Sequence, residues 1–404
     1  MVKVLKFGGS SVATIEKIKE IASYLENRVQ QQEKLVVVVS AMGKTTNQLI
    51  EMAHSISMNP SLRELDRLLS IGEQQTISLL TMALINLGLN AISLTGYQAG
   101  IKTSGKHTKS IIQSIDTTRL EELLKTHDVI CVAGFQGMND LQDITTLGRG
   151  GSDTTAVALA AALECDCEIY TDVDGVYTTD PRVYKDAKKI SHITYEEMME
   201  MSALGSKIME VRSVELGNKY GVTIYVGKTL SDQRGTYIMK KNDMMEEKVL
   251  SAVSVLDNII QVKLEGVHRN SVFIADIFKI ISSHQVNIDM ISEVFLEDET
   301  RLGFTCSQEE QVFLNEAIEE VKEKYPNIKI SQNRKLSKVS VVGIGMKNAV
   351  GIASNLFSIF SELNVPLYQV STSEISISYL VEKEHVSKVV SEICKKYDLS
   401  LIHI

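Results

Sequence analysis

The chain has 404 residues and 44% hydrophobic content, which is enough for two or three domains with ordinary cores. Its formal net charge is −9 and its basic residues are scattered, so composition excludes nucleic acid as an expected partner. Five cysteines without a Cys-X-X-Cys pair favour buried thiols in a reducing compartment over a metal site. The sequence shows neither signal-peptide architecture nor an apolar run of the ~20 residues that cross a membrane, so we expect a cytoplasmic protein.

The first half of the chain alternates short apolar strands with helical patterns. A strand at 2–7 ends at Gly8 and Gly9, and apolar residues then recur at helical spacing from Ile15 to Leu25. A continuous run of mostly β-branched residues follows at 35–43, as is typical of a parallel strand buried on both faces. Further strands are predicted at 90–94, 128–135, 167–173 and 222–226. This alternation predicts an α/β fold with a central, mostly parallel sheet between helices, whose carboxyl-end loops form the functional site.

The stretch 145–163 combines a glycine-rich loop with the start of a helix. Three glycines surround Arg149, and two residues suited to the N-cap of a helix, Ser152 and Asp153, precede a long apolar run. Glycines let backbone N–H groups approach an anion, and the dipole of the following helix favours negative charge. The forked guanidinium of Arg149 is suited to grip a carboxylate or a phosphate. The alternative, a glycine turn before a buried helix, explains the glycines but not the arginine between them.

The second half of the chain contains an internal repeat. It begins with a polar segment, 239–248, which is typical of a linker. Beyond it, the stretch 275–292 aligns with 354–371 without a gap, and each copy lies between alternating strands, as in a βαβ module of the ferredoxin type. The sequence therefore predicts a first domain at 1–238 and a second region at 249–404, with modules at about 258–331 and 337–404 and the strand 249–257 completing the second module.

Six loops of the first domain resemble motifs of the aspartokinases, a family within the amino-acid kinase superfamily. In chain order they are KFGGSSV (6–12), SAMGKTTNQL (40–49), IGE (71–73), GFQG (134–137), TTLGRGGSDTTA (145–156) and TDVDGVYTTDPR (171–182). The C-terminal modules resemble the ACT regulatory domains of the same enzymes, so the resemblance extends over nearly the whole chain. It implies an amino-acid kinase fold as the catalytic domain, followed by two ferredoxin-like ACT domains.

The resemblance implies an aspartate kinase, which uses ATP and Mg²⁺ to phosphorylate the side-chain carboxylate of L-aspartate. The product is 4-phospho-L-aspartate, on the route to lysine, threonine, methionine and diaminopimelate. This reaction needs no general base, because a carboxylate nucleophile is already ionised at neutral pH. The obstacle is repulsion between two anions, so lysines, backbone N–H groups and Mg²⁺ have to neutralise and align the reactants.

By resemblance, Lys6 is the catalytic lysine, Asp153 organises the lysines around the transferred group, and Lys207 is a second cation. The place of Lys6, at a strand end beside glycine amides, suits a phosphate contact, whereas a solvated surface lysine is the alternative. The resemblance assigns no protein ligand to a metal. It assigns the nucleotide to Lys6, Phe7, Gly8, Gly9, Ser40, Thr171, Asp172, Tyr177, Arg182 and Lys207.

The substrate residues carry complementary charges. The resemblance assigns Arg149 to a carboxylate of the substrate and Glu73 to its α-ammonium group, which is what a small dicarboxylic amino acid requires. Without the resemblance, a glutamate at the start of an apolar helix is the alternative interpretation of Glu73. The remaining substrate residues implied by the resemblance are Ser40, Thr46, Phe135, Gly150, Gly151 and Ser152.

The paired modules predict feedback control by lysine, alone or together with threonine. Asp289 is assigned to the ammonium of an effector, and an exposed strand aspartate is the alternative. The other effector residues implied by the resemblance are Asn287, Ile288, Ser292, Val365, Pro366, Ser373 and Glu374. ACT modules pair across subunits, so we expect a homo-oligomer, or an α2β2 assembly whose regulatory subunit starts internally near Met244.

Some positions depart from the family pattern, and two other functions are alternatives. Ser10 stands where many relatives have threonine, and the stretches 209–213 (MEVRS) and 226–232 (VGKTLSD) differ from the commoner forms, which leaves the nucleotide rim open. A kinase of a glutamate-type substrate is disfavoured by Glu73, by the GFQG loop and by the repeat. A non-catalytic amino-acid sensor is disfavoured because Lys6 and Asp153 are both present.

Overall fold

The computed structural model describes residues 1–241, 249–268, 271–295 and 299–400, which form two compact units. The first unit comprises Met1–Val176, Lys189–Ser202 and the chain from Lys207 to 241. The second comprises Tyr177–Lys188, Ala203–Ser206 and the chain from 249 on, so two stretches of the predicted first domain belong to it. The predicted domain limits stay predictions, and most of the expected linker, with the candidate start at Met244, lies outside the described residues.

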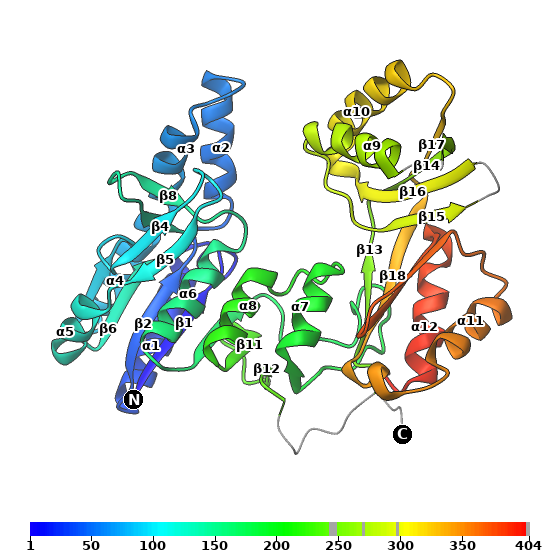
Figure 1. The fold of residues 1–404 in the computed structure, drawn as a ribbon. Coiled ribbons are helices and arrows are strands. Elements are labelled where there is room, and N and C mark those ends of the chain that lie inside the picture. Colours follow the sequence, from blue (N-terminus) through cyan, green and yellow to red (C-terminus); the bar gives the residue numbers. More distant parts are fainter. Residues whose placement is uncertain (242–248, 269–270, 296–298, 401–404) are drawn as a thin grey trace. The chain divides into compact units, whose positions relative to one another are not determined.

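The helices and strands that precede residue 242 build the first unit, apart from the end of α7 (Figure 1). Its strands are β1 (Val2–Phe7), β2 (Lys34–Val39), β3 (Ala91–Leu94), β4 (Ile101–Ser104), β5 (Ile111–Ile115), β6 (Val129–Ala133), β7 (Gln136–Met138), β8 (Ile144–Thr146), β9 (Cys167–Thr171), β10 (His192–Thr194), β11 (Ile224–Lys228) and β12 (Thr236–Met239). The helices are α1 (Ile15–Gln30), α2 (Thr45–Ile56), α3 (Leu62–Leu69), α4 (Ile71–Asn86), α5 (Thr118–Thr126), α6 (Gly151–Ala162), α7 (Tyr195–Ala203) and α8 (Val211–Tyr220).

An eight-stranded sheet in the order β10-β12-β11-β9-β1-β2-β6-β3 forms the centre of this unit. The strands from β11 to β3 in that order run parallel, and only the β11–β12 pairing is antiparallel. The prediction of a mostly parallel central sheet is therefore confirmed. Because β1, β2 and β6 are adjacent and parallel, the loops that follow them meet at one edge of the sheet.

Helices cover both faces of the sheet, and side-chain alternation decides which residues meet them. Leu5 and Phe7 pack with apolar residues of α1 and α4, such as Ile21 and Leu80, in a core cluster on one face. Lys6 points to the opposite face, where α6 packs on β1 and β2. The catalytic lysine predicted from the sequence thus lies on the α6 side of a core strand.

The helical stretch Leu62–Asn86 is long and apolar enough to count as a candidate membrane span, by length and composition only. Half of its apolar window is buried inside the protein, and α4 packs against α1, β3 and β6. A core helix has these properties, so the stretch is explained by the sheet it covers.

A second, smaller sheet of the first unit was not foreseen from the sequence. Its strand order is β5-β4-β7-β8, and α3 packs against β8. The strands are short, with three to five residues each, and partly polar, so they lack the continuous apolar runs that marked the central strands. This sheet supports the glycine-rich loop at 147–151, because β8 leads directly into it.

The second unit holds the two repeat modules. The strands are β13 (Ala252–Leu256), β14 (Ile259–His268), β15 (Ile291–Phe295), β16 (Glu299–Ser307), β17 (Lys329–Asn333), β18 (Leu336–Val342), β19 (Gln369–Thr372) and β20 (Ser376–Glu382). The helices are α9 (Ser271–Ser283), α10 (Gln311–Lys324), α11 (Ile352–Glu362) and α12 (Val386–Lys396), with short 3₁₀ turns at Gln308–Glu310, Ile344–Asn348 and Lys383–His385.

The two modules differ in how their fourth strand is supplied. The first module has the sheet order β15-β16-β14-β17 and takes all four strands from one continuous stretch. The second has the order β13-β18-β20-β19, in which β13 precedes the first module in sequence and pairs antiparallel with β18. The first module is therefore an insertion between β13 and the rest of the second.

Candidate active site

Lys6 and Asp153 form an ion pair at the carboxyl end of β1. The Lys6 Nζ lies 2.5 Å from the Asp153 Oδ1, and Lys6 is only 7% exposed. Lys6 is held in the sheet by its neighbours on β2 and β9, Val38 and Ile169, so its ammonium has a defined position at the first turn of α6. A buried lysine paired with a carboxylate is not the solvated surface lysine that was the alternative.

The start of α6 differs from the sequence prediction. Neither Ser152 nor Asp153 is the N-cap: the N-cap is Gly150, in the left-handed conformation with φ 65°, and no side chain caps the helix. A glycine adopts this conformation without the steric cost that a Cβ brings. Ser152 and Asp153 therefore lie in the first turn of the helix, where Asp153 meets Lys6.

Glu73 is a buried carboxylate on α4 with an incomplete set of partners. It is 3% exposed, and its Oε1 accepts a hydrogen bond of 3.1 Å from the backbone N–H of Ala41, just after β2. Among the described residues, the Glu73 Oε2 has no hydrogen-bond partner. Burial raises the pKa of Glu73 to about 7, against the opposing effect of backbone hydrogen bonds, of which Ala41 donates one. Such an oxygen is ready to accept from a cationic ligand.

Phe135 links the loop after β6 to the glycine-rich loop. Its backbone is in the left-handed region with φ 69°, which is rare for a bulky residue. Its N–H donates to the Thr155 Oγ1 at 3.1 Å, and its carbonyl accepts from the Leu147 N–H at 2.9 Å. The ring lies so close to Gly151 that an added Cβ there would be 2.7 Å from Phe135 Cδ2. The strained backbone is thus fixed at both ends, directly against the start of α6.

Arg149 lies in the glycine-rich loop, and its side chain is 77% exposed. Its Nε is 3.0 Å from the Oε1 of Glu210, the residue that precedes α8. Of the other predicted substrate residues, Ser40 is anchored by its N–H to the Phe7 carbonyl at 3.2 Å, and Thr46 lies in the first turn of α2. A Cβ added to Gly134 would lie 2.8 Å from the Ser152 Oγ, so these two residues approach each other closely.

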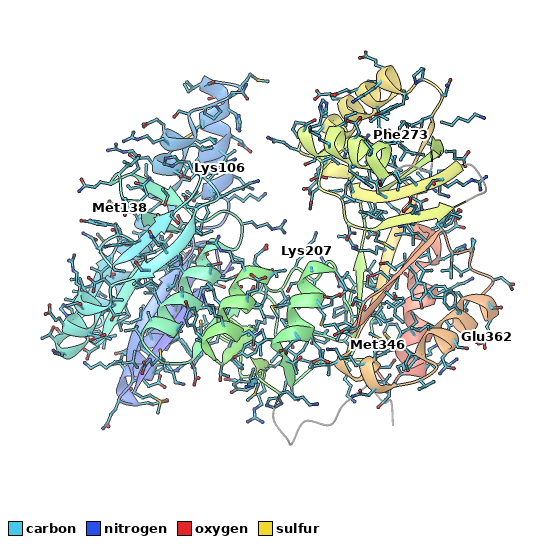
Figure 2. All side chains as sticks on the ribbon, viewed as in Figure 1. Lys106, Met138, Lys207, Phe273, Met346 and Glu362 are labelled. Carbon is cyan, nitrogen blue, oxygen red and sulfur yellow. The ribbon has the colours of Figure 1, made fainter. Side chains whose placement is uncertain are left out.

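The predicted nucleotide residues fall into two groups. Gly8 and Gly9 follow Lys6 in the loop after β1, and an added Cβ on Gly8 would lie 3.5 Å from the Lys6 Nζ. The Phe7 ring stacks on Tyr170 in the core at 5.2 Å, so only its backbone faces that loop. The remaining residues lie elsewhere. Thr171 ends β9 and Asp172 follows it, Lys207 is exposed between α7 and α8 (Figure 2), and Tyr177 and Arg182 belong to the second unit.

Asp66 on α3 is a residue that the sequence reasoning missed. It is fully buried, and its carboxylate accepts hydrogen bonds from the Thr108 N–H at 3.0 Å and from the Thr146 Oγ1 at 2.5 Å. Its Oδ2 also lies 2.7 Å from the His107 Nδ1. Arg212 joins the same two loops by donating to the carbonyls of Leu147 and Ser110, each at 3.0 Å. The signal available in the sequence was an aspartate among residues with the spacing of an amphipathic helix.

The predicted effector residues lie on both modules of the second unit. Asp289 forms an ion pair of 2.5 Å with Lys338, whose side chain is 1% exposed, so the carboxylate assigned to an effector already has an ammonium partner. The Val365 side chain packs in the core of the second module. The others are placed as follows: Asn287 and Ile288 precede β15, Ser292 lies on it, Pro366 follows Val365, and Ser373 and Glu374 lie between β19 and β20.

Comparisons with known proteins match both parts of the chain. A model described as the amino acid kinase family matches residues 1–228, and one described as an ACT domain matches residues 339–397. The chain is 42% identical over 398 residues to aspartokinase 2 of Bacillus subtilis, with 98% of each chain covered.

Two solved structures of E. coli aspartokinase III share the fold. The complex with aspartate and ADP superposes with a TM-score of 0.80, and the complex with lysine and aspartate with a TM-score of 0.78. Both are 22% identical to this chain, and each match covers 98% of this chain and 99% of that one. The end-to-end relationship to the Bacillus enzyme and the kinase-family match over more than half of the sequence lead to one conclusion. This chain is an enzyme of the amino acid kinase family and belongs to the aspartokinases, with C-terminal ACT modules.

Proposed function

We propose that this aspartokinase transfers the γ-phosphoryl group of ATP to the side-chain carboxylate of L-aspartate, giving 4-phospho-L-aspartate and ADP at the entry to lysine, threonine, methionine and diaminopimelate synthesis. The observation that carries the proposal is the meeting of the Lys6–Asp153 ion pair with the loops after β1, β2 and β6 at one sheet edge. The near end-to-end similarity to named aspartokinases supports the choice of substrate.

The charges around this edge suit a dicarboxylic amino acid. The unpartnered Oε2 of Glu73 offers an acceptor to the α-ammonium group, and the guanidinium of Arg149 offers donors to a carboxylate. Held at both ends, the substrate would present its reactive carboxylate without a general base, because that group is already ionised. Ser40, Thr46, Phe135, Gly150, Gly151 and Ser152 would line the remaining surface.

Lys6 would act on the transferred phosphoryl group. Its ammonium is preorganised by Asp153, so it can stabilise charge that develops in the transition state without reorganising. The N-terminus of α6 adds the positive end of a helix dipole at the same place. Lys207 is proposed as a second cation, and Gly8, Gly9, Thr171, Asp172, Tyr177 and Arg182 as further contacts to the nucleotide.

Mg²⁺ supplies a positive charge that screens the phosphates when it is bound. Mg²⁺ keeps most of its water and is commonly held by substrate phosphates together with one or two carboxylates. Asp153 is already paired with Lys6, so we assign no carboxylate of this chain to the ion.

The test is formation of aspartate hydroxamate from ATP, Mg²⁺ and aspartate, with glutamate assayed in parallel. Lys6→Met keeps the length of the side chain and removes its charge, and we expect kcat to fall by about 10²–10³-fold, as when an electrostatic donor is lost from an active site. Lys6→Arg, which keeps the charge, should lose less. Lys6→Met with Asp153→Asn avoids leaving a carboxylate buried and unpaired, so it separates loss of activity from loss of folding.

Lys3→Met is the matched control, since Lys3 pairs with Asp166 at 2.8 Å near the opposite end of the same strand. It should keep wild-type kcat. A folded Lys6→Met/Asp153→Asn protein with undiminished hydroxamate formation would refute the role of Lys6. Hydroxamate from glutamate but not from aspartate would refute the substrate.

Regulation and assembly complete the proposal. Lysine, alone or with threonine, is proposed as the effector of the ACT modules, and titrating both into the same assay tests this: an unchanged rate with each amino acid and with the mixture removes it. The proposed assembly is a homo-oligomer or an α2β2 complex with an internally initiated regulatory subunit, in the cytoplasm.

A further inference from the structure

We propose that Glu210 lowers the affinity of this enzyme for its acidic substrate by competing with the substrate carboxylate for Arg149. The inference rests on the proposed function, in which Arg149 binds that carboxylate. The Glu210 Oε1 lies 3.0 Å from the Arg149 Nε, so the pair is a direct ion pair between side chains.

The position of Glu210 is fixed by its backbone. It is the N-cap residue of α8, and its carbonyl accepts from the Ser213 N–H at 3.0 Å and from the Ser213 Oγ at 2.7 Å. The helix it begins packs against α6, the helix that starts at Gly151. The carboxylate is therefore presented by the start of a helix and not by a free loop.

The Glu210 side chain also packs on the loop that carries Arg149. A Cβ added to Gly150 would lie 2.0 Å from the Glu210 Cγ, so the aliphatic part of Glu210 covers that glycine. Contact with the residue next to Arg149 limits how far the carboxylate can swing away. The ion pair is thus a built feature of the substrate loop, although both side chains reach solvent.

This arrangement affects binding through the donors of the guanidinium. A carboxylate is gripped best by two parallel N–H groups of arginine, and the Nε edge is one of the edges that offers such a pair. A substrate that takes this edge has to displace Glu210. This competition weakens binding of an acidic ligand, and it does not act on the transferred phosphoryl group.

Removing the charge of Glu210 while keeping the shape of its side chain should therefore strengthen substrate binding. We expect Glu210→Gln to lower the KM for aspartate by about 1.5- to fivefold, the size of one solvent-exposed ion pair. The kcat should change less than twofold, because an interaction lost equally from the ground state and the transition state leaves kcat unaltered. The gain should shrink at high salt, since solvent-exposed charges are screened.

The experiment is a double-mutant cycle on the full-length enzyme. Aspartate KM and kcat are measured at saturating ATP for wild type, Glu210→Gln, Arg149→Gln and the double variant, at low and high ionic strength. Competition predicts that Glu210→Gln lowers KM in the wild type but has no effect once Arg149 is replaced. Glu64→Gln is the control, because it removes the same charge from an exposed ion pair with Arg63 and should leave KM unchanged.

The possible results separate the inference from the proposed function. If Arg149→Gln raises KM and Glu210→Gln leaves it unchanged or raises it, the competition is refuted while the role of Arg149 stands. If Arg149→Gln leaves KM unchanged, Arg149 does not bind the substrate, and both its proposed role and the competition are refuted. A gain that persists in the Arg149→Gln background would assign the effect of Glu210 to general charge and overturn the proposal. Thermal unfolding of each variant checks that the fold is intact.

Discussion

Glu73 is the residue whose local environment bears most directly on substrate binding. It lies in the first turn of an apolar helix, where a helix-start glutamate was the alternative interpretation from the sequence. Burial against the loop after β2 raises its pKa to about 7 and leaves one oxygen without a partner among the described residues. A carboxyl group of this kind changes charge in the range where the enzyme works.

We predict that aspartate affinity rises with pH up to the pKa of Glu73 and then levels off. The raised pKa means that Glu73 is largely protonated below about 7 and ionised above it, and only the ionised form attracts the α-ammonium group. Calorimetric titration of aspartate between about pH 6 and 8 should show a Kd that falls as pH rises, by about fivefold between pH 6 and 7 and by less than twofold above that.

Glu73→Gln provides the control for this pH dependence. It keeps the shape of the side chain but cannot ionise, so the Kd should be higher than that of the wild type above neutral pH and independent of pH. A Glu73→Gln enzyme whose Kd still falls with pH would show that another group titrates, and would contradict the assignment of the ammonium to Glu73.

At the scale of elements, the loop that carries Arg149 is held by charged side chains inside the protein. Asp66 on α3 binds both the loop between β4 and β5 and the end of β8, and Arg212 on α8 binds the carbonyls of Leu147 and Ser110. Lys106, which belongs to the β4–β5 loop, is marked in Figure 2. These bonds connect two helices, α3 and α8, and the small sheet to the start of the glycine-rich loop, so the position of Arg149 depends on them.

We predict that Asp66→Asn destabilises the first unit and raises the KM for aspartate. The amide cannot accept from all the donors that face Asp66, and leaving buried polar groups unpaired costs about 2–4 kcal/mol of unfolding free energy. Urea unfolding measures the first effect and steady-state kinetics the second. Asp128→Asn, at a half-buried carboxylate paired with Lys34, should cost about 1 kcal/mol or less and leave KM unchanged. An Asp66→Asn protein as stable as the wild type would contradict the role given to the hydrogen bonds of Asp66.

At the scale of the whole molecule, a buried lysine joins the two modules of the second unit. Lys338 comes from β18 of the second module, and its ammonium reaches Asp289, which precedes β15 of the first. The lysine side chain is 1% exposed while Asp289 is 43% exposed, so the two partners differ in their access to water. Asp289 was predicted to hold the ammonium of an effector, and here it holds one from the chain itself.

We predict opposite outcomes for the two halves of this ion pair. Asp289→Asn leaves a buried ammonium without its counter-charge and should destabilise the second unit by about 3 kcal/mol, whereas Lys338→Met leaves a carboxylate that water can solvate and should be nearly neutral. Calorimetric unfolding of the full chain tests this. The exposed pair of Lys347 and Glu374 is the control, and removing either member should cost less than about 0.5 kcal/mol. Equal losses for Asp289→Asn and Lys338→Met would contradict the asymmetry.

Local patterns in the sequence were sufficient for the central sheet and the repeat, but not for the small sheet of the first unit. The order of strands and helices, the mostly parallel sheet and the repeat of the second half follow from apolar periodicity and glycine positions, which act within a few residues of each other. The resemblance to the aspartokinases rested on short loops for the same reason. The N-cap of α6 was predicted wrongly because a left-handed glycine and a capping side chain are alternative ways to start a helix, and the choice depends on the surrounding packing.

Only the tertiary structure decided which charges meet. Arg149 with Glu210, Asp66 with Thr146, and Lys338 with Asp289 are each separated by dozens of residues in sequence, and no local pattern couples them. The small sheet was missed because its strands are too short and polar to show a period. Sequence therefore determined the long apolar strands and the helices that cover them, since these depend on neighbours along the chain, but not the short strands of the small sheet. The tertiary structure determined the partners of the buried and paired charges, because the energy of a charge depends on what folding brings beside it.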